Sequence, residues 1–291
     1  MPSLEFTLMV GCPLKCTFCP QDNLRGSYAN RTKYLSLSDF KTILDKVPKH
    51  VRIDFSGMAE PWANPEATAM LRHTLDSGYR IAIYTTLYGM EPADAEEVVG
   101  LLRQYTTRVE VLCLHLPDRN GNMRGWKYSP EYEAALRQFI ALGLSRVLLK
   151  FEVMTMDVGG KPHAALDHLQ IQLGSWVGHT RAGNVSKDDV PGQVIAKKPE
   201  HHSAVSCTFT PFYDQNVCLP NGDVVLCCMD YSIKHKIGNL LEQEYYEMFS
   251  SGGMSSLIAE NMTPRFSENS LCKTCDRAKL HRLIHTNLFW Q

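Results

Sequence analysis

Strand-like and helix-like segments alternate from the amino terminus to about residue 180, and this alternation restricts the fold more than any other feature. Val51–Phe55 and Ile81–Thr85 are short apolar runs of the kind that form buried strands. Ser36–Val47 instead carries apolar side chains at helical spacing, with Ser36 or Ser38 as the candidate N-cap. Repeated pairs of this length predict an α/β fold, a parallel sheet with helices on its outer face. The other expected strands are Glu5–Val10, Val109–Leu116 and Arg146–Met154, and the other expected helices are Pro65–Ser77, Pro92–Arg103, Pro130–Leu142 and Ala164–Leu173.

Composition excludes several classes of protein. The 291 residues are 44% hydrophobic and 21% charged, which permits a large core and excludes a mostly disordered chain. Thirty basic against 31 acidic residues leave a net charge of −1, so we expect no nucleic-acid partner. The sequence contains neither a long apolar run nor an export signal, so we expect no membrane span and a cytoplasmic location.

The last third of the chain differs in composition from the first part. A stretch rich in Gly, Asn, Asp, Pro and Lys predicts a linker or a long loop, and a small cysteine-rich α+β module follows it. In that module we expect a hairpin around Asn216–Cys227 turning at Asn221–Gly222, a helix near Glu242–Ser250 and a final helix from Lys273. The expected boundaries are 1–181, 182–205 and 206–291.

Three of the ten cysteines follow the first expected strand closely, as Cys12-x3-Cys16-x2-Cys19. In a reducing compartment such clustering favours metal ligands over disulfides. A tetrahedral zinc site would need a fourth ligand, and the sequence offers none nearby. A cubane iron–sulfur cluster held by three cysteines would instead keep one iron open. Structural zinc and a disulfide remain the alternatives.

This spacing, with Phe18 just before the last cysteine, resembles the radical S-adenosylmethionine (SAM) superfamily. The resemblance implies a partial (β/α)6 TIM-like barrel in which the open iron of a [4Fe–4S] cluster binds the amino and carboxylate groups of SAM. Reductive cleavage of SAM then yields methionine and a 5′-deoxyadenosyl radical. The resemblance also implies that Phe18 packs near the adenine, with plain core packing as the alternative.

Two later segments extend the resemblance. The sequence Ser-Gly57-Met-Ala-Glu60-Pro after the second expected strand is similar to the family's G-G-E-P segment, which binds the SAM amino group. Gly57 permits close backbone approach, and the Glu60 carboxylate can accept from an ammonium group. Thr85 and Thr86 follow the third expected strand, where the family has a small polar residue near the SAM ribose or carboxylate.

The remaining cysteines gather in the last third of the chain. The segment from Cys207 to Asp230 and the closing C-x2-C resemble the SPASM auxiliary-cluster module of radical SAM enzymes. No cysteine follows Cys275, which resembles the shortened, one-cluster "twitch" form. The implied ligands of one auxiliary [4Fe–4S] cluster are Cys207, Cys227, Cys272 and Cys275. A zinc ribbon is the alternative, and we expect Cys218 and Cys228 to be small buried hydrophobic residues.

Candidate residues on the substrate side come from strand alternation and from charge. Alternation along Val109–Leu116 places Cys113 and His115 on one face, toward the mouth of the expected barrel. Glu152 is a candidate for contact with SAM or substrate, because a charge inside a barrel is costly unless it is paired or functional. Arg181 could bind a hydroxyl, phosphate or carboxylate between the two modules, or be a solvated surface charge.

We expect an oxidoreductase that acts on a small polyhydroxylated molecule such as a sugar, sugar nucleotide or aminocyclitol. The radical removes a C–H hydrogen, a base takes the hydroxyl proton and the auxiliary cluster accepts the remaining electron, while a flavodoxin or ferredoxin supplies reductant. Two features favour this substrate class. The chain begins at its first strand, without the leading domain of many peptide-maturing relatives, and the module has the single cluster of sugar- and aminocyclitol-modifying relatives.

Three alternatives remain open. A radical SAM epimerase would use a cysteine thiol, with Cys113 as the candidate, to return a hydrogen atom to the substrate radical. A peptide-modifying maturase would need a macromolecular partner. A non-enzymatic electron carrier or redox sensor would hold two clusters without binding SAM.

Overall fold

The computed structural model describes residues 1–30, 32–155, 160–174, 178–186, 188–189 and 198–280. Its main feature is an eight-stranded sheet in the order β11-β10-β9-β1-β3-β4-β5-β7. The strands from β9 to β7 run parallel, whereas β10 and β11 are antiparallel to their neighbours. This mostly parallel sheet confirms the predicted α/β class. The strands are β1 (Ser3–Phe6), β3 (Arg52–Phe55), β4 (Ile81–Thr85), β5 (Val109–Leu116), β7 (Phe151–Thr155), β9 (Gln215–Cys218), β10 (Asp223–Val225) and β11 (Lys236–Asn239).

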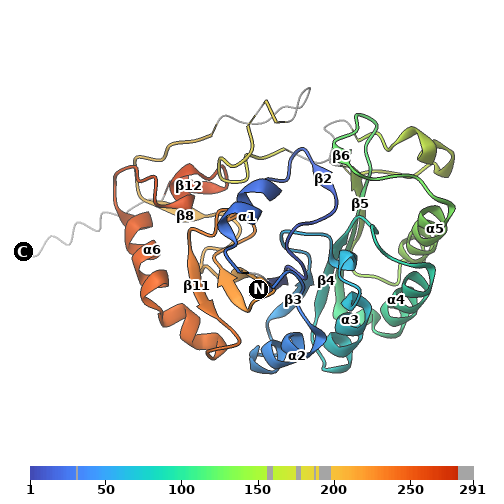
Figure 1. The fold of residues 1–291 in the computed structure, drawn as a ribbon, viewed down its shortest axis with the longest axis horizontal. Helices are drawn as coiled ribbons and strands as arrows, with labels where there is room; N and C mark the ends of the chain where they lie inside the picture. The colour runs from blue at the N-terminus through green and yellow to red at the C-terminus, as the bar shows by residue number, and fades with distance from the viewer. Residues whose placement is uncertain (31, 156–159, 175–177, 187, 190–197, 281–291) are drawn as a thin grey trace, which may run out of the picture.

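Four helices cover the outer face of this sheet, side by side (Figure 1). They are α2 (Leu37–Lys46), α3 (Ala67–Asp76), α4 (Pro92–Gln104) and α5 (Pro130–Leu144). Of the two candidate N-caps, Ser36 caps α2, because its hydroxyl accepts a hydrogen bond from the Asp39 backbone N–H at 3.0 Å. Ser129 caps α5 in the same way. Within the described residues, no helix is long and apolar enough to cross a membrane.

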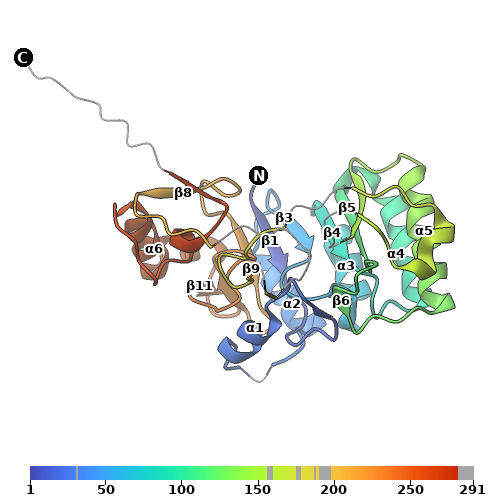
Figure 2. The ribbon, with the colours of Figure 1, turned by 90° about the horizontal axis from the view of Figure 1, so that it is seen from above.

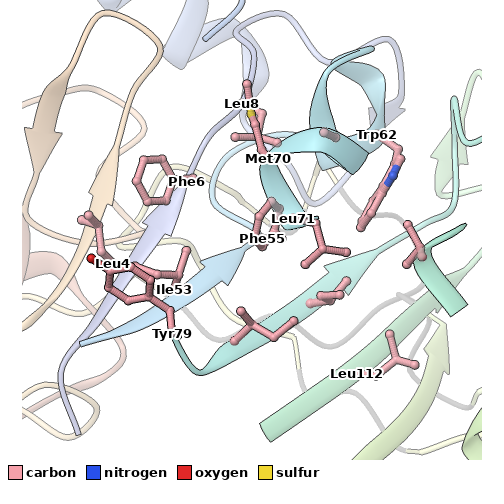
Figure 3. Close-up of a cluster of buried hydrophobic side chains, with 14 of the residues drawn as sticks. Leu4, Phe6, Leu8, Ile53, Phe55, Trp62, Met70, Leu71, Tyr79 and Leu112 are labelled. Atoms are coloured by element: carbon pink, nitrogen blue, oxygen red, sulfur yellow. The ribbon is translucent and has the colours of Figure 1, made fainter. Parts of the chain in front are cut away.

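The main core lies between the outer face of the sheet and these helices. On β1 and β3, alternate side chains such as Phe6 and Phe55 point outward and are fully buried against Phe40 of α2 (Figure 3). Glu5 directly precedes Phe6, and Asp54 directly precedes Phe55. Both acidic residues face the other side of the sheet, since successive strand residues point to opposite faces. The inner face is therefore free to carry polar chemistry.

The C-terminal module extends this sheet rather than standing apart from it. Its hairpin turns at Asn221–Gly222 as predicted and consists of β9 and β10, and β9 pairs with β1 in parallel. Seen from above, β1 and β9 lie side by side between the helices and the rest of the module (Figure 2). The rest comprises β8 (Val205–Cys207), a 3-10 turn (Tyr245–Ser250), α6 (Gly252–Met262), a 3-10 turn (Leu271–Thr274) and β12 (Ala278–Leu280).

Several expected elements differ in the structure. The final helix predicted from Lys273 is wrong as far as residue 280, because Ala278–Leu280 forms strand β12 paired with β8; residues 281–291 lie outside the described residues. The strand expected from Arg146 begins at Phe151, since Arg146 has a left-handed φ of 57°. The helix expected at Ala164–Leu173 is a 3-10 segment that ends at Leu169. Part of the expected linker lies outside the described residues, and α6 was not predicted.

The shorter elements lie mainly around the cysteine loop and between the larger elements. They are β2 (Lys15–Cys16), α1 (Gln21–Ser27), a 3-10 turn (Pro61–Ala63), a 3-10 turn (Thr106–Arg108) and β6 (Met123–Arg124). β2 pairs with β6, which connects the cysteine loop to the loop after β5.

Candidate active site

A cavity of about 390 Å³ opens on the inner face of the sheet and is lined by residues from both parts of the chain. Of the residues singled out for the N-terminal cluster, SAM and substrate, all but one line it. They are Cys12, Cys16, Phe18, Cys19, Gly57, Glu60, Thr85, Thr86, Cys113, His115 and Arg181. The volume lies within the range of small-molecule sites.

The cysteine loop presents three sulfur atoms to the cavity. Burial raises the pKa of Cys12 to about 11, and burial, followed by the neighbouring thiols, raises that of Cys16 well above its usual value. Thiolates in this position therefore need a compensating positive charge, which a metal centre provides. The Cys19 sulfur accepts a hydrogen bond from Gln21 Nε2 at 3.3 Å and lies 3.4 Å from the hydroxyl of Tyr231.

Glu60 is buried, with 5% of its surface exposed, and both oxygens of its carboxylate accept hydrogen bonds from groups of this chain. Oε1 accepts from the Thr85 hydroxyl at 2.6 Å and from the Trp62 backbone N–H at 3.2 Å. Oε2 accepts from the hydroxyl and the backbone N–H of Thr86, both at 2.6 Å. Glu60 thus ties the end of β4 to the Gly57–Pro61 loop, and both threonine hydroxyls point to this carboxylate.

Gly57 is required by the backbone at its position. Its φ is +79°, and a Cβ there would lie 2.4 Å from Thr7 Oγ1. Thr7 in turn accepts a hydrogen bond from the Met58 backbone N–H at 2.9 Å. Gly57 therefore lets the loop after β3 approach Thr7, just after strand β1. This contact positions the loop at the cavity.

The predicted wall residues lie in the cavity lining, as strand alternation indicated. Burial, then the charge of Arg181, lowers the pKa of His115 to about 4, so this imidazole is neutral near pH 7. Burial raises the pKa of Cys113 to about 12, which keeps it a protonated thiol. Phe18 is buried beside Val185 and the sulfurs of Cys16 and Cys19.

Arg181 faces the same cavity from the segment that precedes the C-terminal module. Its guanidinium lies 5.9 Å from the ring centre of Tyr231, within the range of a cation–π contact. Within the described part of the chain, no carboxylate lies within ion-pair distance of it. Arg181 is therefore available to an anionic or hydroxyl group of a ligand.

Glu152 is the one predicted residue outside the lining. Its carboxylate forms an ion pair with Lys150 at 3.1 Å, and its side chain is 37% exposed. The pairing with Lys150 explains why a charge is tolerated on this strand, and nothing in this placement supports contact with SAM.

Strand alternation on β1 and β3 also brings two carboxylates into the cavity that were not predicted. Glu5 accepts hydrogen bonds from the Ser56 hydroxyl and the Gly57 backbone N–H, both at 3.2 Å. Asp54 is held by Arg52 through two contacts of 2.6 and 2.7 Å. A charged residue between two apolar strand neighbours was the available signal, the same one that pointed to Glu152.

A second, smaller cavity of about 50 Å³ lies in the C-terminal module, and the four predicted auxiliary ligands line it. Two of their sulfurs accept hydrogen bonds from backbone N–H groups: Cys207 from Thr210 at 3.5 Å and Cys275 from Arg277 at 3.4 Å. Such donors are typical around thiolate ligands.

The two remaining cysteines of the module differ from each other. Cys218 is fully buried, lines neither cavity, and its thiol donates to the Leu219 carbonyl oxygen, as a small core residue does. Cys228 instead lines both cavities, and it is near enough to Glu5 for each group to affect the pKa of the other. Glu5 and Gln215 likewise line both cavities, so these three residues form the wall between them.

Comparison with protein families agrees with this geometry. Residues 6–160 match the profile of the radical SAM superfamily, and residues 207–276 match that of the SPASM iron–sulfur cluster-binding domain. The chain belongs to the radical SAM superfamily. The profile covers more than half of its length, and the SPASM match covers the predicted auxiliary cysteines.

Two solved structures share this fold. BtrN in complex with AdoMet and 2-DOIA has a TM-score of 0.58 and 15% identity, covering 96% of this chain and 93% of BtrN. anSMEcpe with bound AdoMet has a TM-score of 0.53 and 15% identity, covering 94% of this chain and 86% of anSMEcpe. These likenesses confirm the predicted partial barrel followed by a small module. A search of curated protein sequences finds no match.

The residues present fit the cofactors that a radical SAM fold implies. Three half-buried thiols line the larger cavity, beside the Gly57–Glu60 loop and Arg181. The module's four thiols surround a space larger than the roughly 10–15 Å³ that one water needs. Among the described residues, no three thiol, imidazole or carboxylate groups converge closely enough to hold a single metal ion. A multi-iron cluster, in which each thiolate binds a different iron, does not require the thiols to converge on one point.

Proposed function

We propose that this radical SAM protein oxidises an alcohol of a small polyhydroxylated substrate, such as a sugar, sugar nucleotide or aminocyclitol, to a carbonyl. The proposal assigns Cys12, Cys16 and Cys19 to a [4Fe–4S] cluster that binds SAM, and the four module cysteines to an auxiliary [4Fe–4S] cluster. When bound, the first cluster and SAM supply the radical that removes a hydrogen atom from the substrate.

The polar inner wall of the larger cavity carries this proposal. Below the cysteine loop, that wall includes hydrogen-bonding side chains from five neighbouring parallel strands, together with Cys113 and Met154. The hydrogen-bonding side chains are Glu5 from β1, Arg52 and Asp54 from β3, Tyr84 from β4, His115 from β5 and Gln215 from β9. Some of these groups have partners in the chain, since Arg52 pairs with Asp54 and Glu5 accepts from Ser56 and Gly57. A molecule with a hydroxyl on most of its carbons can form hydrogen bonds with the remaining donors and acceptors.

Glu5 is the group that we assign as the base for the substrate hydroxyl. Burial and then the Asp54 charge raise its pKa to about 7, which suits proton transfer near neutral pH. Donors from Ser56 and Gly57 hold one of its oxygens. Glu5 also borders the auxiliary cavity, so a substrate oxygen beside it would lie next to the proposed electron acceptor.

Arg181 and Phe18 are proposed to bind and orient the ligands. The Arg181 guanidinium, held over the Tyr231 ring, can donate to a carboxylate of SAM or to substrate hydroxyls. Phe18 offers an apolar face for the adenine beside the cysteine loop. The BtrN structure, which contains AdoMet and 2-DOIA, supports a small-molecule substrate through shared fold.

The test is an anaerobic assay of the reconstituted protein with SAM, dithionite and a panel of aminocyclitols, sugars and sugar nucleotides. We expect one substrate to increase 5′-deoxyadenosine release and to yield a product lighter by two hydrogens. Cys16→Ala is the control that should abolish both. If the wild-type protein carries both clusters but releases no 5′-deoxyadenosine, the enzymatic proposal fails and a role in electron transfer replaces it.

Cys113 supports a second candidate, a redox-neutral epimerase. Its thiol lines the cavity and stays protonated, so it carries a hydrogen atom that a substrate radical could take. In this case the product would have the mass of the substrate. Cys113→Ala would stop turnover while SAM cleavage continued. Unchanged turnover in this variant would eliminate the thiol donor.

Free cluster-forming thiols and an open cluster suit a reducing compartment, so we propose a cytoplasmic location and a flavodoxin or ferredoxin as electron donor. We also propose that residues 1–181 form the radical SAM part, 182–205 the connection and 206–291 the auxiliary module. A peptide substrate would show itself in the same assay as activity that requires a macromolecular partner.

A further inference from the structure

Tyr231 connects the C-terminal module directly to the cysteine loop. Its hydroxyl lies 3.4 Å from the sulfur of Cys19, although the two residues are 212 positions apart in the sequence. Only 2% of Tyr231 is exposed, and it comes four residues after Cys227, a proposed ligand of the other cluster. One short segment therefore contacts both proposed cluster sites.

The chemistry of a ligand sulfur determines the direction of this hydrogen bond. A cysteine bound to iron has lost its proton, so the Tyr231 hydroxyl must donate to Cys19. Gln21 donates to the same sulfur through Nε2, which also donates to the Met58 carbonyl oxygen. That second bond fixes the amide with its NH₂ group toward Cys19. One sulfur thus receives two donors, one from each module.

The position of Tyr231 is well determined. Asp230, just before it, accepts from the backbone N–H groups of Lys234 and His235, both at 2.8 Å, which closes a tight loop. Tyr231 belongs to a buried apolar cluster that includes Val10 and Met58 from the N-terminal part and Val217 from the module. The hydroxyl is therefore held against the sulfur by packing from both modules.

We propose that Tyr231, together with Gln21, raises the reduction potential of the N-terminal cluster by donating to the Cys19 sulfur. A hydrogen bond to a ligand sulfur stabilises the additional negative charge of the reduced cluster. Tyr231 acts through Cys19 and is thus a positioning residue. The inference rests on the proposed assignment of Cys19 as a ligand, and it does not depend on the substrate.

The test measures the midpoint potential of the N-terminal cluster in wild type and variants, with the EPR signal of the reduced cluster as the readout. The first variant lacks only the Tyr231 hydroxyl. We expect Tyr231→Phe to shift the potential of the N-terminal cluster to more negative values, and Tyr231→Phe with Gln21→Leu to shift it further. Tyr28→Phe is the matched control. Tyr28 lies in the same apolar group, but its hydroxyl donates to the Thr32 carbonyl oxygen at 2.7 Å, so its removal should leave the potential unchanged.

A second variant keeps the shape of the side chain. Replacing Tyr231 with 3-fluorotyrosine makes the hydroxyl a stronger donor, and we expect a shift to more positive values. An unchanged potential in both Tyr231 variants, with the cluster present by iron content and EPR, would overturn the inference. If the wild-type protein assembles no N-terminal cluster, the proposed function fails instead, so the two failures are distinguishable.

Discussion

Glu5 on β1 and Asp54 on β3 are partners in the register of neighbouring parallel strands, and both carboxylates face the larger cavity. Arg52 neutralises Asp54 through a two-contact ion pair. Glu5 lacks such a partner among the described residues, and burial is the main cause of its raised pKa. Burial raises the pKa of both carboxylates, and the ion pair with Arg52 opposes this rise at Asp54, whereas no ion pair opposes it at Glu5 among the described residues.

Glu5→Gln should change how stability depends on pH. Because the pKa of Glu5 rises from 4.5 to about 7 on folding, the folded state binds the proton more tightly than the unfolded state. Folding stability is therefore lost as pH increases through that window, by at most about 3 kcal/mol. The glutamine does not titrate, so the variant should gain stability relative to wild type between about pH 4.5 and about pH 7.

Urea unfolding of the metal-free protein on either side of that window provides the measurement. The other charged or titratable groups that interact with Glu5 are Asp54, Tyr84, Cys228 and Arg181, and they remain in both proteins. The difference between variant and wild type therefore isolates Glu5. An equal difference at low and at high pH would contradict the raised pKa.

Glu60→Gln should destabilise the protein by about 1–3 kcal/mol, the cost of a buried donor left without an acceptor. The carboxylate accepts four hydrogen bonds, and an amide nitrogen in place of one oxygen cannot accept two of them. Chemical denaturation measures the loss. Glu96→Gln, on the exposed face of α4, is the control and should change stability by less than about 0.5 kcal/mol. Similar values for both variants would mean that the Glu60 bonds contribute little.

Gly57→Ala should cost more than Gly78→Ala, although both glycines have a positive φ. Gly78, at φ +91°, has open space around the missing Cβ, so alanine there bears only the backbone strain of about 1–2 kcal/mol. At Gly57 the new methyl group would also overlap Thr7, which adds about 1–3 kcal/mol. Thermal or urea unfolding of both variants gives the comparison. An equal loss of stability in the two variants would contradict the predicted overlap with Thr7.

Cys227→Ala and Cys218→Ala separate a proposed cluster ligand from a core cysteine of the same hairpin. Reconstituted Cys227→Ala should lose iron and sulfide, by up to about half, because the auxiliary cluster loses one of its four proposed protein ligands. Cys218→Ala should keep its iron, because that thiol donates to a backbone carbonyl and lines neither cavity. Iron and sulfide analysis decides. Full iron in Cys227→Ala would remove Cys227 from the ligand set.

Local signals predicted much of the fold. Ser36 and Ser129 precede well-patterned apolar residues, so α2 and α5 were found close to their true bounds. The pairing of β9 with β1 joins segments more than 200 positions apart, and no local pattern encodes it. The error at Ala278–Leu280 has the same origin, because its strand structure depends on β8 as a partner.

Cysteine motifs and strand alternation predicted many of the residues that line the larger cavity. Alternation on β5 selected Cys113 and His115, and the structure has both in the lining. Alternation on β1 likewise places Glu5 opposite the apolar Leu4 and Phe6, but Glu5 was not among the predicted residues. Tyr231 carries no signal in its own neighbourhood, since its contact with Cys19 exists only once both modules are folded.

The pairing of β9 with β1 also determines when this chain can finish folding. Until residues 215–218 have left the ribosome, one edge of β1 has no neighbour, and its backbone N–H and C=O groups are exposed. Almost three quarters of the polypeptide is then already synthesised. During synthesis, the unpaired edge of β1 can therefore form backbone hydrogen bonds with other chains. Truncation before β9 would leave that edge unpaired in the finished protein.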